Sequence, residues 1–135
     1  MATGTTVVPS DDTIPQSTEG DQFMTQAITP TSLVNLLRVS HLGHYSNSSS
    51  ADIAAALFQD SAVNALSVGW NTVPNTGYAH TPSLEYLMIA GTSSVTTFKI
   101  RAGAGAGTTT FNGAGGARKY GGVLSSRLTV EEIFV

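Results

Sequence analysis

Polar and apolar residues alternate over several short stretches of the chain, and Gly, Pro, Ser or Asn separate these stretches. Residues 95–101 (VTTFKIR) show the pattern most clearly, because Thr96, Phe98 and Ile100 fall on one face. Alternation with a period of two predicts a β-strand with one buried face. The same pattern predicts further strands at residues 5–9, 21–29, 65–73, 78–90, 108–111 and 124–135.

Two stretches fit a helix as well as a strand. In residues 32–42 (SLVNLLRVSHL) the leucines have helical spacing, whereas Leu37, Val39 and His41 alternate as in a strand. Residues 51–59 (ADIAAALFQ) are rich in Ala, and a helix there is the alternative on propensity. We predict strands in both stretches because the surrounding chain is β. The second strand is expected to form a hairpin with the strand that follows it.

These patterns predict one all-β domain. They give about eight short strands with turn signals roughly every 8–12 residues, which is typical of an antiparallel β-sandwich or barrel. The chain has 135 residues and suits a single domain, 1–135. The strand that ends the chain is expected to close a sheet. Turns or polar loops are predicted at residues 10–20, 45–50, 60–64, 74–77, 91–94 and 112–113.

Charge and composition exclude some partners. Charged residues make up only 11% of the chain and the net charge is −3. A nucleic-acid interface needs a basic stripe, which the scattered basic residues do not form, so we predict no nucleic-acid partner. No apolar run approaches the ~20 residues of a membrane span, so we predict no membrane insertion. The chain contains no Cys, which excludes disulfides and thiolate metal sites.

The residues that could carry chemistry do not form a recognisable motif. His41 and His44 lie three residues apart, which on a strand places them on opposite faces, and one metal ion then suits them poorly. Ser, His and Asp all occur, but without the G-x-S-x-G elbow. The Gly-rich runs at 103–107 and 113–116 lack the spacing of nucleotide loops and are interpreted as turns.

The carboxylates of residues 11–21 are interpreted as part of a solvated loop. Ca²⁺ binding in that loop is one alternative, because clustered carboxylates suit a hard cation. A pair of glycosidase carboxylates, drawn from this loop or from Asp52 and Asp60, is the other. We predict no catalytic residue, no cofactor, no metal site and no enzymatic activity.

Aromatic side chains with polar edges suit glycans and protein interfaces. Trp70 and Tyr86 lie within strand patterns and are interpreted as core residues. Tyr120 lies in a Gly-rich loop beside Arg118 and Lys119. Loops carry binding residues more often than strands do, so Arg118, Lys119 and Tyr120 are the predicted partner contacts.

Four segments carry a resemblance to a known family: residues 11–16 (DDTIPQ), 56–60 (ALFQD), 110–113 (TFNG) and 126–133 (SRLTVEEI). With them, nearly the whole chain resembles a domain widespread in virion proteins of tailed bacteriophages, often found at the C-terminal end of tail-fibre-like proteins. The resemblance implies a role at the virion surface. It also implies a jelly-roll-like sandwich, loosely similar to the trimeric tumour-necrosis-factor and complement-head folds.

A fibre protein would carry a long shaft before such a domain, whereas Met1 sits almost directly on it here, as it also would in a fragment of a longer fibre. We therefore predict a non-enzymatic capsid decoration (cement) protein on the phage particle surface. It would form a dimer or trimer and bind the major capsid protein. Residues 1–10 would be an arm that reaches this partner, with Val7 and Val8 as contacts. The alternative is a tail-fibre tip that binds a host-surface glycan or receptor through loops 43–50, 74–77 and 112–122.

Overall fold

The computed structural model describes residues 1–72 and 74–135, and these residues form an all-β fold. One 3₁₀ turn, η1 (Tyr120–Gly122), interrupts the strands. The predicted antiparallel sandwich is confirmed, with more strands than the eight expected. The strands are β1 (Ala2–Gly4), β2 (Asp21–Ile28), β3 (Leu36–Leu42), β4 (Tyr45–Asn47), β5 (Ile53–Gln59), β6 (Ser67–Asn71), β7 (Ala79–His80), β8 (Ser83–Ile89), β9 (Thr96–Ala104), β10 (Thr109–Phe111), β11 (Gly113–Ala114), β12 (Ala117–Arg118) and β13 (Arg127–Ile133).

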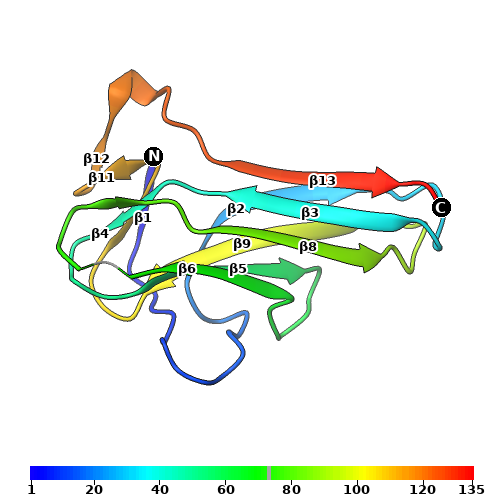
Figure 1. Ribbon diagram of the computed structural model, residues 1–135, viewed down its shortest axis with the longest axis horizontal. Helices are drawn as coiled ribbons and strands as arrows, with labels where there is room; N and C mark the ends of the chain where they lie inside the picture. Colours follow the sequence, from blue (N-terminus) through cyan, green and yellow to red (C-terminus); the bar gives the residue numbers. More distant parts are fainter. Residues whose placement is uncertain (73) are drawn as a thin grey trace.

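Two sheets face each other along the long axis of the molecule (Figure 1). The first sheet has the order β2-β9-β5-β6 and the second has the order β13-β3-β8, all antiparallel. The edge strands also meet, because β2 contacts β13 and β6 contacts β8. The inward faces of the two sheets supply a single apolar core, which includes Leu37, Val39, Ile53, Ala55, Leu57, Leu84, Phe98, Ile100 and Leu128.

The second sheet continues past an interruption at one end of the sandwich. Gly43 separates β3 from β4, and Pro82 lies opposite it, between β7 and β8. Beyond this point β4 pairs with β7 on one side and with β10 on the other, and β1 completes this four-stranded sheet. The place that β13 occupies beside β3 is therefore taken by β10 beside β4.

Between β10 and β13 the chain leaves the sheet over residues 112–126, which we call the excursion. It contains the β11-β12 hairpin and η1, and it projects from one end of the sandwich (Figure 1). Ser126 closes its base, because its Oγ accepts a hydrogen bond from the His44 amide (2.8 Å) and donates one to Asn112 Oδ1 (2.7 Å). The Asn112 amide donates to the His44 carbonyl (2.8 Å), so both ends of the excursion are tied to one residue.

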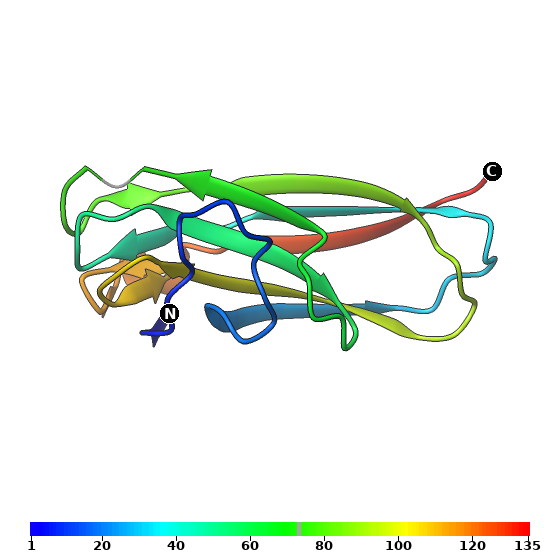
Figure 2. The same cartoon turned by 90° about the horizontal axis from the view of Figure 1, so that it is seen from below.

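Residues 5–20 cross the outer face of the first sheet, as Figure 2 shows for the blue segment. Arg101 holds the segment by donating to the carbonyls of Glu19 (2.9 Å) and Gly20 (2.7 Å). Under it, the outward side chains of Ala56 and Phe58 on β5 are buried, while that of Ala54 is half-buried. The predicted strand at 5–9 is wrong: the segment makes single hydrogen bonds, such as Val8 N to Ala104 O (3.2 Å), instead of a ladder.

Several strand predictions are confirmed by the registers. Residues 36–42 of the 32–42 stretch form β3, and residues 53–59 of the 51–59 stretch form β5 instead of a helix. The predicted hairpin pairs β5 with β6, while Val73, at the end of its second predicted strand, lies outside the described residues. The predicted 78–90 strand is divided between two sheets as β7 and β8.

The prediction of a polar loop at 45–50 is wrong for its first half, because Tyr45, Ser46 and Asn47 form the buried strand β4. The Tyr45 hydroxyl and the Asn47 side-chain amide nitrogen have specific partners, whereas Ser46 Oγ and Asn47 Oδ1 are buried without a hydrogen bond to the described residues. The Asn47 amide donates to the carbonyls of Ser49 (2.9 Å) and Ala106 (2.8 Å), and the Tyr45 hydroxyl lies 3.1 Å from His41 Nε2. Hydrogen bonds of this kind make burial of polar groups tolerable.

Candidate functional site

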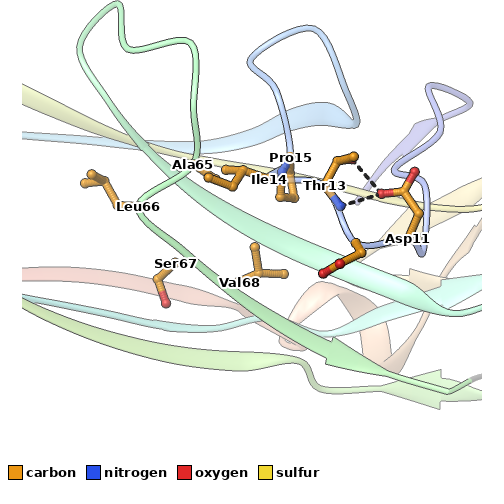
Figure 3. A pocket seen from close by; sticks show the side chains of 9 residues that line it. Asp11, Thr13, Ile14, Pro15, Ala65, Leu66, Ser67 and Val68 are labelled. Atoms are coloured by element: carbon orange, nitrogen blue, oxygen red, sulfur yellow. Dashed lines mark hydrogen bonds between the residues drawn. The ribbon is translucent and has the colours of Figure 1, made fainter.

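A groove lies between residues 8–15 and the edge strand β6. It consists of two adjoining hollows of about 420 and 310 Å³ that share Asp11, Thr13, Pro15 and Val68 among their lining residues. Figure 3 shows the first hollow, with the loop carrying Asp11 and Thr13 on one side and Ser67 and Val68 on the other. Trp70 lines the second hollow.

Asp11 presents a carboxylate in this groove. Its Oδ1 accepts hydrogen bonds from the amide (2.9 Å) and the hydroxyl of Thr13 (dashed lines in Figure 3). These bonds favour the charged form and lower the pKa of the Asp11 carboxyl. Within the described part of the chain, its other oxygen, Oδ2, makes no hydrogen bond to protein and is free to accept one.

The interpretation of Trp70 as a core residue is wrong, because its side chain is 61% exposed. Trp70 lies on β6 on the face that points away from the core, directly opposite Ala54 of β5. The small Ala54 side chain leaves the indole uncovered on that side. Tyr86 does pack against the core, as expected. Alternation predicted the strand but not which of its faces points outward.

The excursion presents the three predicted contact residues together. Arg118 ends β12, Lys119 follows it, and Tyr120 begins η1, all with exposed side chains. Tyr120 is 80% exposed and has a positive φ of 49°. A non-glycine residue in that region is uncommon, so the backbone turns sharply here and holds the phenol ring away from the sandwich.

The N-terminal residues pack onto the domain. β1 pairs with β10, and Val8 is only 3% exposed, so it is buried within the fold. Val7 remains exposed on the surface. Asp21 also fixes this segment by accepting hydrogen bonds from the amide and hydroxyl of Thr6 (2.9 and 3.0 Å). In this structure residues 1–10 are thus part of the fold, and of the two valines only Val7 presents a surface to a partner.

The strand ends near the C-terminus (Figure 1) carry apolar side chains that are exposed or half-buried. Ile133, Leu36 and Ile89 are direct cross-strand neighbours on β13, β3 and β8. Leu87 follows on the same face of β8, and the next row carries the Arg38–Glu131 ion pair. We call this surface the apolar end; it consists of Leu33, Val34, Leu36, Leu87, Ile89, Ile133, Phe134 and Val135.

The apolar end is held in shape by a carboxylate. Glu132 Oε1 accepts hydrogen bonds from the Asn35 side chain (2.8 Å) and from the amide and hydroxyl of Thr31 (2.8 and 3.0 Å). The bond from Asn35 does most to lower the pKa of the Glu132 carboxyl. Because Glu132 belongs to β13 and Thr31 to the loop before β3, these bonds join the two segments that carry the apolar side chains.

The histidines are placed by structural contacts. His41 is buried with Nδ1 2.9 Å from the Arg127 carbonyl and Nε2 3.1 Å from the Tyr45 hydroxyl. A neutral ring, donating from Nδ1 and accepting at Nε2, satisfies both partners, and burial lowers the pKa of His41. His44 lies on the turn that follows and is tied to Ser126 through its backbone. Among the described residues, no three His, Asp or Glu side chains form a group suited to a metal ion.

Most acidic side chains anchor loops. Asp60 accepts hydrogen bonds from the Thr96 hydroxyl and the Thr97 amide (both 2.8 Å). Asp52 accepts one from the Ser10 hydroxyl (2.9 Å), and Glu19 accepts one from the Gln16 amide (2.9 Å). Carboxylates used in this way stabilise the connections between strands. Of the acidic residues considered for a glycosidase, Glu19, Asp21, Asp52 and Asp60 therefore hold loops in place, whereas Asp11 and Asp12 line the groove.

Comparison of the chain with protein-family models finds no match, and comparison with curated proteins finds none either. Across residues 1–72 and 74–135, no helix has the length and apolarity needed to cross a membrane.

Proposed function

We propose that this chain is a non-enzymatic structural protein of a tailed-bacteriophage virion. In this role it decorates the capsid and associates with itself and with the major capsid protein. The resemblance of its sequence segments to virion domains motivates the proposal. The single observation that carries it is the apolar end, in which a cross-strand row of aliphatic side chains is continued by further exposed apolar residues next to it in the chain. Soluble monomers rarely leave large contiguous patches of this kind in water, and such patches mark protein interfaces.

The surroundings of the patch support this reading. The Arg38–Glu131 ion pair borders the apolar row, and the next row carries Thr129, Ser40 and Glu85. An apolar centre with a polar rim is the usual anatomy of a protein–protein interface. Packing of such a patch against a copy of the chain gives the predicted dimer or trimer, and packing against a capsid subunit gives the decoration.

A second function is favoured by the excursion. Tyr120, Arg118 and Lys119 project from the sandwich on a short, sharply turned loop. An exposed Tyr with adjacent cations suits contact with a receptor surface. The runner-up proposal is therefore a tail-fibre tip domain that meets a host-surface glycan or receptor with the excursion.

Quantitative mass spectrometry of purified virions distinguishes the capsid decoration protein from the tail-fibre tip. A decoration protein is expected in a fixed ratio to the major capsid protein, at a copy number set by the capsid lattice. A copy number that matches the tail appendages would move the assignment to the fibre tip. Absence of the chain from purified virions would reject both.

A further inference from the structure

We infer that the groove beside Trp70 is a binding site for a neutral oligosaccharide. This site lies on the outer face of the first sheet, away from the apolar end, and the inference does not rest on the proposed capsid role. It also differs from the loops that sequence reasoning considered for glycan recognition, because β6 and residues 8–15 form it.

The indole of Trp70 supplies the first element of such a site. A Trp in a fully apolar pocket would be buried, whereas Trp70 lines a hollow and is 61% exposed. Pro9, Val68 and Ala54 line the same hollow with small or flat apolar surfaces. The C–H face of a sugar ring stacks on such an aromatic surface, since aromatic side chains combine a large apolar face with polar surroundings.

The second element is a set of hydrogen-bonding groups suited to hydroxyls. Asp11 Oδ2 is an open acceptor, and the Thr13 bonds that hold Oδ1 also fix the orientation of the carboxylate. Ser67 adds a hydroxyl group to the lining, and Ser10, whose hydroxyl donates to Asp52, adds an acceptor. A sugar hydroxyl donates and accepts at once, so a lining that mixes carboxylate and hydroxyl groups matches it.

The third element is charge. Asp11 and Asp12 line the groove, and no Lys or Arg is among its described lining residues. An acidic sugar would meet uncompensated repulsion there, which selects a neutral one. Because the two hollows share lining residues and lie end to end along β6, the occupant is longer than one ring. A basic peptide would also tolerate this charge, and the experiment below separates the two.

The chain contains one Trp, so its fluorescence reports on this groove alone. The full chain is applied to an array of neutral and acidic glycans of bacterial and animal surfaces, and hits are titrated by fluorescence and calorimetry. Tetralysine is titrated in parallel as a cationic probe. We expect saturable binding of a neutral oligosaccharide with a shift in Trp emission, and no saturable binding of tetralysine.

Three variants locate the site. Trp70→Ala is expected to weaken binding about tenfold or more by calorimetry, because the stacking surface is lost. Asp11→Asn keeps an acceptor for the Thr13 turn but replaces the open carboxylate with an amide, and we expect binding roughly three- to tenfold weaker. Tyr78→Ala removes an exposed aromatic side chain outside the groove and serves as the matched control, with unchanged affinity expected.

Circular dichroism establishes that each variant is folded. Absence of binding to every glycan on the array would overturn the inference, and so would saccharide binding that is unchanged in Trp70→Ala. Binding of tetralysine without any saccharide, lost in Trp70→Ala, would assign the groove to a basic peptide instead.

Discussion

Replacement of Ile89 by Asp tests the apolar end directly. Ile89 lies at the β8 end of the cross-strand row, beside Leu36 on β3, and 62% of its surface is exposed. Full burial of an Ile side chain contributes about 1.5–3 kcal/mol. Covering the exposed fraction therefore contributes about 1–2 kcal/mol for each subunit, and about 2–4 kcal/mol in a dimer that buries both copies.

At about 1.4 kcal/mol for each tenfold change, the loss corresponds to a dissociation constant roughly 30- to 700-fold weaker. A buried, unpaired Asp raises this cost further. The fold itself is expected to tolerate the change within about 0.5 kcal/mol, because the side chain is exposed in the isolated chain. Ile89→Asp is therefore predicted to be a folded monomer at concentrations at which the wild-type chain is oligomeric.

Sedimentation velocity over a range of concentrations measures this equilibrium. Val123→Asp is the matched control, because Val123 is 82% exposed and lies on the excursion at the opposite end of the molecule (Figure 1). Equal association of wild type and Ile89→Asp would refute the reasoning. Loss of association in Val123→Asp alone would place the interface on the excursion.

Three further changes test the fold around these surfaces. Gly69→Ala should lower the free energy of unfolding by about 1–3 kcal/mol in urea titrations, because a Cβ on β6 would collide with the Ser83 carbonyl of β8. Gly105→Ala is the control and should be neutral, because the space around Gly105 is open. Equal effects of the two substitutions would contradict the contact between β6 and β8. The wild-type melting temperature should fall as the pH is lowered from about 7 to about 5, because burial lowers the pKa of His41 below 6.5 and the unfolded chain then binds the proton more readily. In His41→Gln the melting temperature should depend less steeply on pH. An unchanged slope would be evidence against the role of His41. Glu132→Gln should have a lower melting temperature than wild type at neutral pH. This difference in melting temperature should disappear as the pH falls below about 4.5, because the carboxylate that Asn35 stabilises becomes protonated. A difference that does not depend on pH would exclude that role of the carboxylate.

The alternation of polar and apolar residues predicted the strands that have one face exposed to solvent. In β9 the residues Thr96, Phe98 and Ile100 are buried while Thr97, Lys99 and Arg101 are less so, as the alternation required. The Ala-rich stretch of β5 was more ambiguous because both of its faces are buried, one against the core and the other under residues 5–20. A two-sided burial of this kind removes the alternation on which a strand prediction depends.

The apolar end and the groove beside Trp70 could not be predicted because they arise from strand register and from which faces are covered. Leu36, Ile89 and Ile133 are far apart in the sequence, and only the pairing of β13, β3 and β8 brings them into one row. Trp70 was assigned to the core because alternation alone does not tell which face of a strand is covered. The buried strand β4 was missed because its polar residues find their partners elsewhere in the fold: Tyr45 meets His41 of β3, and Asn47 meets the carbonyl of Ala106.

Cryo-electron microscopy of intact virions at side-chain resolution tests the central proposal most directly. We expect density for this sandwich repeated over the capsid lattice, with the apolar end, including Ile89 and Phe134, buried against a neighbouring copy or a capsid subunit. Density confined to the tips of tail appendages, or a lattice-bound sandwich with the apolar end facing solvent, would contradict it.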